Sequence, residues 1–462
     1  MNLRPRLLTL CAALAVASLF HSSGDAAYAG PRDPSDRCRS AFESNPGAKK
    51  KKKGTGEDMA PLHMALFGDS IVWGQGLKER DKFWCRVQQW VELKTGRDVR
   101  VWSYAHSGAV IEQPDLMEGQ VDDRYFRGDE KQVGPGGDKD WVPGGEVNVG
   151  FPTITEQVEQ AAGQMGGARD GINLVLVDGC INDVNFRNIL DRSNTPENVE
   201  GLTRAKCGEP MRRLLANIRG KFPNAYVIVT GYYPLIFKGL KENGETVVKG
   251  TANNQLTRSA FKALGSSCEC KGGECKNHED DAREKLDDLS RVWFETSNSA
   301  LAEAVDNTNR DLPADGETRV HFAELHFPPD YAFSTKQSLL WNIRLGATGV
   351  GGLRKVVVVM LDIFRAIDTN DDRWDDRGDQ CKAASLMFHR RANEMADENK
   401  KKQLKELLRG YVFVCRRASL GHPNKFGALL YAQAITARLQ TILPETKWAE
   451  GLAPAGGGSP RP

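Results

Sequence analysis

Residues 62–77 read LHMALFGDSIVWGQGL, and the rest of the predicted fold extends outward from them. The first six residues are mostly apolar and contain neither proline nor glycine, which is typical of a buried strand. Gly68 ends this run, and an amphipathic helix follows a few residues later. We therefore expect Ser70 in a tight turn at the carboxyl end of a strand, the edge of an open α/β sheet where ligands bind. A serine there either caps a helix or acts as a nucleophile.

Four more strands are predicted, and helices separate them. The strands cover 99–105, 172–177, 225–230 and 319–325, and the helices cover 83–95, 152–162, 210–221, 286–305 and a final helix with Pro423 in its first turn. Strands that alternate with helices predict a parallel sheet in a three-layer α/β/α domain.

The N-terminus has the features of a secretory signal. Arg4 and Arg6 supply positive charge, residues 7–20 are apolar, and Ala27-Tyr28-Ala29 forms a small-residue cleavage site. The apolar stretch is too short for an ordinary spanning helix, and no later segment is long and apolar enough. We therefore expect residues 1–29 to be a signal peptide and the protein to be secreted, periplasmic or extracellular.

Composition divides the remaining chain into three parts. Residues 30–57 are polar and include the lysine run 49–53, so they are predicted to be a disordered linker. Residues 58–445 form the predicted domain, with a polar insertion at about 238–279, and 446–462 form a Gly/Pro-rich tail. The formal charge of +2 gives no reason to expect a nucleic-acid partner.

Export makes the cysteines candidates for disulfides. The chain has ten, and removal of Cys11 with the signal leaves an odd number. Cys381 and Cys415 are the first pair we would expect to be bridged. The cluster Cys268-x-Cys270-x4-Cys275-x2-His278 has zinc-like spacing, but disulfides in a surface loop are favoured in an exported protein.

One acidic stretch has the spacing of a calcium-binding loop. Its residues are Asp368, Asn370, Asp372, Asp376 and Asp379. The stretch lacks both the glycine that makes the sharp turn and the final bidentate glutamate, so a solvated acidic loop is favoured. We predict no metal site and no cofactor.

Three predicted strand ends and one loop carry residues suited to hydrolysis. A serine nucleophile such as Ser70 needs a base, usually a neutral histidine, and His422 lies just before the last helix. The resulting oxyanion needs donors, and these would be the N–H groups of Ser70 and Gly108 and the amide of Asn182. Taken singly, Ser70 could lie in an ordinary turn, Asn182 could cap a helix, and His422 could be a loop residue.

Together these stretches resemble the SGNH hydrolases, also called GDSL esterases and lipases, of the exported bacterial type. Gly68-Asp69-Ser70 matches the first block, Gly108 the second, Asn182 the third, and His422-Pro423-Asn424 the last. The resemblance spans 62–443 apart from the insertions. It implies a flavodoxin-like sandwich with a five-stranded parallel sheet and large insertions. It also implies Ser70 as nucleophile, His422 as general base, and Ser70, Gly108 and Asn182 as the oxyanion hole.

Two positions depart from the family pattern. Cys180 stands two residues before Asn182, where the family usually has glycine. Ser419 stands three residues before the histidine, where the family has the aspartate of its triad. A serine cannot stabilise an imidazolium as a carboxylate does. Either a backbone carbonyl orients His422 in a Ser–His dyad, with Ser419 as a His-orienting candidate, or an acid comes from elsewhere. The candidate acids are Glu324, Asp330 and Asp376.

The sequence therefore predicts an exported serine hydrolase that cleaves carboxylic esters through an acyl-enzyme. The expected partner is a small-molecule or lipid ester. An alternative is an O-acetyl esterase acting on polysaccharide or cell-wall glycan. An alternative of another class is a catalytically dead binding module on the same scaffold. Acyl and alcohol specificity and oligomeric state are not encoded in these patterns.

Overall fold

The computed structural model describes residues 38, 60–113, 145–237, 239–242, 245–249, 278–311, 318–333, 335, 337–341, 343–345, 367–369 and 371–443. The predicted signal and tail, the linker apart from Cys38, the cysteine cluster apart from His278, and most of the predicted insertion lie outside these residues.

Five strands form one parallel sheet. They are β1 (Leu62–Phe67), β2 (Val99–Ser103), β3 (Ile172–Val177), β4 (Tyr226–Thr230) and β7 (Val320–Ala323), in the spatial order β2-β1-β3-β4-β7. The five predicted strands and the flavodoxin-like order are confirmed. Every residue of β3 and β4 is buried, which explains why both are continuous apolar runs.

The strand order reverses between β1 and β3, and the crevice at this reversal is the expected ligand-binding position. β1 pairs with β2 on one side and with β3 on the other, so that Leu66 is level with Ser103 and Leu176. The carboxyl ends of the three strands therefore lie together at one edge. In doubly wound sheets the crevice at such a reversal is the ligand-binding position.

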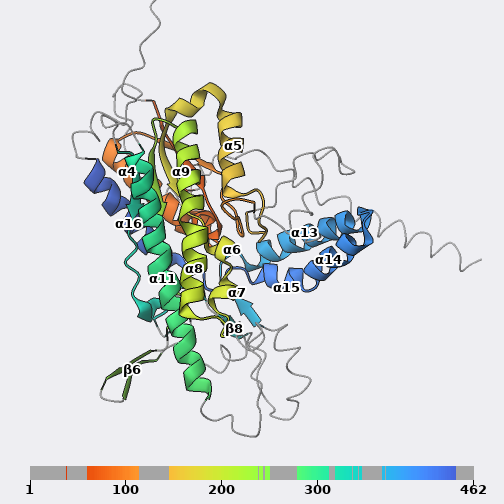
Figure 1. Ribbon diagram of the computed structural model, residues 1–462. Helices are drawn as coiled ribbons and strands as arrows, with labels where there is room; N and C mark the ends of the chain where they lie inside the picture. The colour runs from red at the N-terminus through yellow and green to blue at the C-terminus, as the bar shows by residue number, and fades with distance from the viewer. Residues whose placement is uncertain are drawn as a thin grey trace, which may run out of the picture. The chain divides into compact units, whose positions relative to one another are not determined.

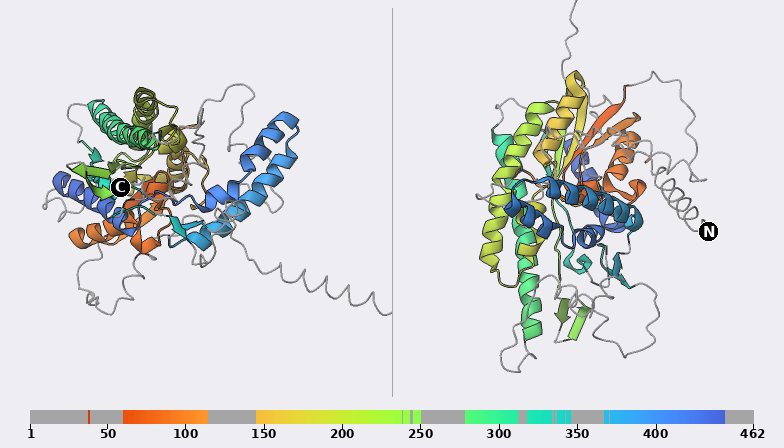
Figure 2. Two further views of the ribbon diagram at one scale, coloured as in Figure 1. Left: turned by 90° about the horizontal axis from the view of Figure 1, so that it is seen from below. Right: turned by 90° about the vertical axis from the view of Figure 1, so that its right-hand side faces the viewer.

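Helices cover both faces of the sheet (Figures 1 and 2). On one face α4 (Phe83–Thr95) packs against α16 (Lys425–Ile442). On the other face lie α5 (Ile154–Met165), α8 (Pro196–Cys207), α9 (Glu209–Lys221) and α11 (His278–Arg310). The three predicted layers are thus present, although the apolar stripe of 196–207 was not recognised as a helix.

The final helix begins later than predicted. Asn424 is its N-cap, because its side chain accepts the N–H groups of Phe426 and Gly427, and the first helical residue is Lys425. Pro423 therefore precedes the cap, and its predicted place in the first turn is wrong. A side chain with an acceptor oxygen satisfies the free N–H groups of a helix start, which proline cannot do.

The remaining elements are short, apart from three helices near the C-terminus. The short ones are α3 (Ser70–Trp73), η1 (Glu79–Asp81), η3 (Gly166–Gly171), α6 (Ile181–Val184), α7 (Phe186–Ile189), η5 (Pro329–Tyr331) and two antiparallel strand pairs, β5 (Gly239–Glu242) with β6 (Glu245–Lys249) and β8 (Ile343–Leu345) with β9 (Ile367–Thr369). The three helices are α13 (Trp374–Glu394), α14 (Glu398–Leu408) and α15 (Tyr411–Arg416).

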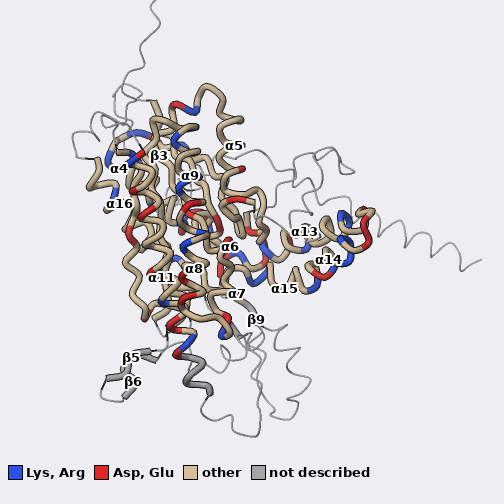
Figure 3. Tube along the Cα trace, viewed as in Figure 1, with Lys and Arg blue, Asp and Glu red and all other residues tan. Residues whose placement is uncertain are grey.

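Helices α13–α15 share a small core of their own. Its members are Cys381, Ala384, Phe388, Ala392, Leu404, Leu408 and Cys415, with Val147, Val149 and Phe151. The expected Cys381–Cys415 disulfide is confirmed and joins α13 to α15. Asp376 and Asp379 lie inside α13, so the expectation of an acidic loop is wrong for them. Acidic and basic residues are interspersed along α13 and α14 (Figure 3).

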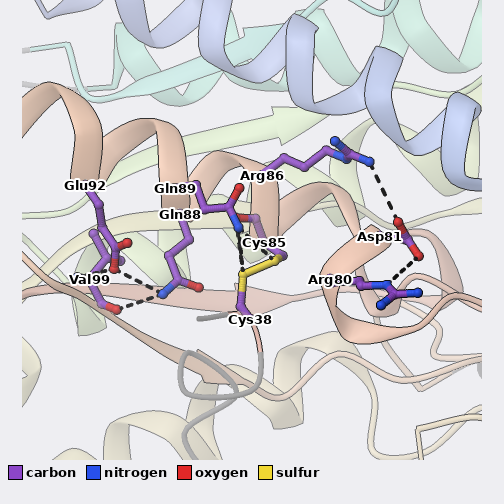
Figure 4. The surroundings of a disulfide bond; sticks show 9 residues. All are labelled: Cys38, Arg80, Asp81, Cys85, Arg86, Gln88, Gln89, Glu92 and Val99. Carbon is purple, nitrogen blue, oxygen red and sulfur yellow. Dashed lines mark hydrogen bonds and ion pairs between the residues drawn. A yellow bond between two sulfur atoms is a disulfide. The ribbon is translucent and has the colours of Figure 1, made fainter. Parts of the chain in front are cut away.

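Two further disulfides were not paired from the sequence. Cys180 joins Cys207, and Cys38 joins Cys85 of α4. Figure 4 shows the second bridge beside polar side chains of α4, where Gln89 Nε2 donates to Cys38 Sγ at 3.5 Å. In the same view Gln88 Nε2 donates to the Val99 carbonyl at 3.2 Å, which ties α4 to β2.

Candidate active site

The turn that follows β1 requires glycine at its first position. Gly68 has φ +147°, and a Cβ there would lie 2.0 Å from Asp178 Oδ1. The side-chain amide of Gln157 holds this residue from both sides, accepting its N–H at 2.9 Å and donating to its carbonyl at 3.1 Å. A side chain would disrupt the close approach of β1 and β3, since glycine alone has no Cβ to displace.

Asp69 caps the short helix that carries Ser70. Its side chain accepts the N–H of Ile71 at 2.8 Å and the hydroxyl of Tyr232 at 2.9 Å, while its own N–H donates to Asp178 at 2.8 Å. Ser70 is the first residue of α3 and is 4% exposed. These bonds fix the serine at the strand edge, with its N–H among the free donors of a helix start.

Asp69 and Asp178 form a buried acidic pair behind the serine. Burial raises the pKa of both carboxyls, and the charge of Asp69 helps to raise the pKa of Asp178 well above its ordinary value. Two neighbouring carboxyls in a dry interior each disfavour the charged form of the other, which adds to the effect of burial. The hydrogen bonds of the pair go to the turn and to Tyr232, and not to His422.

His422 reaches Ser70 from the loop before α16. Its Nε2 lies 2.7 Å from Ser70 Oγ, although 352 positions separate the two residues along the chain. Burial lowers the pKa of His422 to about 4, an effect that the charge of Arg377 reinforces. The imidazole is therefore neutral at pH 7 and can accept the serine proton.

Backbone contacts hold the histidine loop in place. Trp341 N–H donates to the His422 carbonyl at 2.7 Å, and Gly421 N–H donates to the Trp341 carbonyl at 3.0 Å. The hydroxyl of Tyr233 donates to the Gly421 carbonyl at 2.8 Å. Among the described residues no acceptor meets His422 Nδ1 in good hydrogen-bond geometry. The backbone carbonyls of Leu420 and Ser419 are the polar groups beside the ring that favour its protonated form.

Gly108 follows β2 in a turn that only glycine adopts easily. It has φ +85°, and a Cβ there would lie 2.5 Å from the backbone nitrogen of Val149. The adjacent Ser107 bonds to the same irregular segment, donating its N–H to the Gly145 carbonyl at 2.9 Å and accepting the Val149 N–H at 3.2 Å. The turn is thus fixed by the segment 145–149.

Asn182 lies in α6, directly after β3. Its Nδ2 donates to the carbonyl of Ala109 at 2.9 Å, which links the turns after β3 and β2. An amide nitrogen has two N–H groups, so one remains for another acceptor. The neighbouring Asp183 accepts the Ile111 N–H with both oxygens at 3.1 Å, and burial raises the pKa of Asp183 to about 7.

Cys180, at one departure from the family pattern, adopts a backbone conformation suited to glycine. Its φ is +115°, in the left-handed region that side chains disfavour. Its disulfide to Cys207 of α8 holds the residue there. Cys180 therefore adopts the positive φ that glycine would adopt, and Asn182 still follows this turn at the edge of the sheet.

At the other departure, Ser419 does not point its hydroxyl at the histidine. Ser419 Oγ donates to Asp371 Oδ2 at 2.7 Å and accepts from Arg377 at 3.0 Å. The earlier acid candidates lie elsewhere: Glu324 is exposed and Asp376 pairs with Arg373 at 3.2 Å.

Asp371, the carboxylate behind Ser419, was missed from the sequence. It falls within the acidic stretch weighed as a calcium site, which was the one local signal available. Asp330, the third acid candidate, lies in η5 and is half-buried.

Within the described part of the chain no group of three or more His, Cys, Asp or Glu residues could hold a metal ion. A search of the same residues finds no helix that is long and apolar enough to cross a bilayer.

Comparison with known proteins gives distant structural matches only. No family model matches the chain, and no curated protein does. Phospholipase A1 from Streptomyces albidoflavus NA297 aligns with 14% identity over 63% of this chain and 91% of its own, at a TM-score of 0.32. An extracellular lipase from Streptomyces rimosus aligns with 14% identity over 61% and 87%, at 0.30. The lipase Lip_vut3 from a goat rumen metagenome aligns with 13% identity over 57% and 80%, at 0.28. These likenesses are too low to support a conclusion about activity.

Proposed function

We propose that this protein is an exported serine hydrolase that cleaves carboxylic esters, of the esterase or lipase type. The observation that carries the proposal is the 2.7 Å distance between Ser70 Oγ and His422 Nε2 at the reversal point of the sheet. A hydroxyl paired with a neutral imidazole is the arrangement that activates serine as a nucleophile. The disulfides and the signal-like N-terminus support export.

The proposed reaction has two halves. His422 takes the proton of Ser70 as the hydroxyl attacks the acyl carbon, and the N–H groups of Ser70 and Gly108 with the free amide N–H of Asn182 bind the oxyanion. The imidazolium then protonates the departing alcohol, which leaves an ester between Ser70 and the acyl group. His422 next takes a proton from water, whose attack releases the acid and restores Ser70.

Substitution of the serine tests this assignment. Ser70→Ala should abolish turnover of a p-nitrophenyl ester and labelling by a fluorophosphonate, because both require the same oxygen. Ser299→Ala removes an exposed hydroxyl of α11 and is the matched control, with activity and labelling as in the wild type. Undiminished ester turnover in Ser70→Ala would refute the proposal. Failure of the wild type to react with the probe would favour a binding module.

A second comparison tests the role of the loop before α16. His422→Ala removes the base, whereas Ser419→Ala removes a hydroxyl that bonds to Asp371 and not to the imidazole. We expect the loss of kcat in Ser419→Ala to be far smaller than in His422→Ala. Equal losses would mean that Ser419 acts directly on the histidine.

The substrate class needs a separate measurement on the purified mature protein. A profile of activity against acyl chain length distinguishes lipid esters, which favour long chains, from the O-acetyl groups of polysaccharide or cell-wall glycan. Activity confined to acetyl esters would replace the lipase assignment by the acetyl esterase alternative.

A further inference from the structure

One fully buried arginine joins two carboxylates beside the site. The side chain of Arg377 on α13 is 0% exposed, as are those of Glu146 and Asp371, and its Nη atoms lie 2.9 Å and 2.6 Å from their respective oxygens. Arg377 Nε donates to the Arg416 carbonyl at 2.9 Å. We name Glu146, Arg377 and Asp371 the buried ion cluster.

The cluster holds the segment that follows the nucleophile. Trp73, the last residue of α3, donates its indole N–H to Glu146 Oε1 at 3.0 Å. The Gln75 side-chain amide donates to the Glu146 carbonyl at 3.2 Å, and the Gly76 carbonyl accepts the Asp372 N–H at 3.0 Å. The chain leaving Ser70 is therefore bound twice to Glu146 and once to Asp372, the residue after Asp371.

Gly76 also permits the close packing of this segment. A Cβ at Gly76 would lie 3.0 Å from Ser419 Cβ and 3.1 Å from Asp371 Cβ, tighter than ordinary contact. Glycine at position 76 thus allows the segment after Ser70 to pack closely against Ser419 and Asp371.

The same cluster holds the segment that carries the histidine. Ser419 Oγ bonds to Asp371 at 2.7 Å and to Arg377 at 3.0 Å, and the Ser419 carbonyl accepts the His422 N–H at 2.9 Å. Ser419 is 0% exposed. The turn that presents the imidazole is therefore anchored to the cluster by its first residue.

A buried lysine lies beside the tryptophan that contacts the cluster. The Lys82 ammonium lies 3.6 Å from the centre of a Trp73 ring and 3.2 Å from Glu79 Oε1. Glu146 is among the charges that oppose the burial-driven lowering of the Lys82 pKa. Lys82 thus lies against the indole that contacts Glu146.

We propose that the buried ion cluster positions Ser70 and His422 relative to each other, so that Glu146, Arg377 and Asp371 are positioning residues of the reaction. The inference rests on the proposed function. None of the three contacts the reacting atoms, and each acts through Trp73 or Ser419. Since Nδ1 of His422 has no side-chain acceptor among the described residues, this fixed backbone takes the place of a triad carboxylate. Misplacement by about 1 Å can cost a reaction about 100-fold in rate.

A structural role alone would give a different result from a positioning role. Buried ion pairs are weak contributors to net stability, because desolvation offsets their attraction, whereas removal of one partner leaves an unpaired charge. The test therefore measures catalysis and stability separately and compares the cluster with the apolar core that α13 shares with α14 and α15.

The first variants are Arg377→Met and Arg377→Lys, with Leu404→Ala in the α13–α15 core as the matched control. We expect Arg377→Met to lower kcat about 100-fold with KM changed less than about threefold, since placement and not binding is lost. Labelling of Ser70 by a fluorophosphonate should slow in parallel. Arg377→Lys should restore part of kcat, and Leu404→Ala should lower the free energy of unfolding with kcat within about twofold of the wild type.

The pH profile supplies a readout that mere destabilisation would not produce. The ionisable groups facing the histidine loop are Asp371, Arg377 and Tyr233. Asp371 raises and Arg377 lowers the pKa of His422. Asp371→Asn should therefore move the acid limb of kcat/KM to lower pH, and Arg377→Met should move it to higher pH. Asp371→Asn keeps the side-chain shape and provides this measurement even if Arg377→Met does not fold.

Two outcomes would overturn the inference. In the first, Arg377→Met retains kcat in proportion to its folded fraction, as Leu404→Ala does. In the second, the acid limb of Asp371→Asn coincides with that of the wild type. If instead the wild type fails to hydrolyse esters or to label at Ser70, the proposed function itself fails, and the inference fails with it.

Discussion

Ester hydrolysis by this protein should persist in acid that would protonate an ordinary histidine. Burial lowers the pKa of His422 from 6.5 to about 4. At pH 5.5 about 97% of such a group is neutral, against about 9% of a histidine with the ordinary value, from the definition of pKa. The free-enzyme value governs kcat/KM. We therefore expect kcat/KM at pH 5.5 to be close to its value at pH 7, where an unperturbed histidine would give a loss of about eightfold.

The assay is initial-rate hydrolysis of a short-chain ester between pH 4 and 8 at constant ionic strength. A folded-state pKa below the unfolded one means that His422 contributes stability above pH 6.5, which is lost as the pH falls toward 4. Samples held at each pH are therefore returned to pH 7 and assayed again to separate protonation from unfolding. An acid limb centred at or above about pH 6 would refute the reasoning.

Three further predictions concern stability. Gly68→Ala should lower the free energy of unfolding by about 3 kcal/mol or more. The added Cβ would lie 2.0 Å from Asp178 Oδ1 at a positive φ, and urea titration against the wild type measures the loss. Asp183→Asn should gain stability relative to the wild type as the pH rises from about 4 to about 7. The native carboxyl keeps its proton over that window while the unfolded one releases it, so thermal melts at pH 4.5 and 8 should diverge, and parallel melts would contradict the raised pKa. Replacing Cys381 and Cys415 together by alanine should cost about 3–4 kcal/mol for a closed loop with a sequence separation of 34 residues. Thermal melts of the wild type with and without reductant supply the control, and an unchanged midpoint in the double variant would count against a stabilising bridge.

The sheet could be read from local signals. β1, β3 and β4 are short apolar runs because both of their faces are covered, and each ends at glycine or a polar turn that marks the carboxyl edge. The order of the turns after β1, β2 and β3 then predicted which residues would meet. Prediction failed for α13–α15, because the buried face of α13 includes Arg377, Gly378 and Ser385 and so interrupts the apolar pattern, and because these helices pack on a separate small core.

The pairing of cysteines that are distant in the sequence could not be predicted from local patterns. Cysteine positions suggested the Cys381–Cys415 bridge, but nothing local indicates that Cys38 would meet Cys85 or Cys180 would meet Cys207. The predicted start of the last helix was wrong because proline and asparagine are adjacent there, and only side-chain geometry shows that Asn424 is the cap.

The candidate residues Ser70, Gly108, Asn182 and His422 could be named from the sequence because each lies in a short stretch that resembles a family block, and Gly108 also occupies a turn with positive φ. The group behind the histidine could not. Asp371 and Arg377 come from a segment that no local pattern ties to the site, and they reach Ser419 only through packing across 48 and 42 positions. Periodicity and turn chemistry act within a few residues, whereas a buried charge is satisfied by whichever partners the folded chain brings to it. That is why the sequence alone did not explain the serine at position 419, whose partners Asp371 and Arg377 come close to it only in the folded protein.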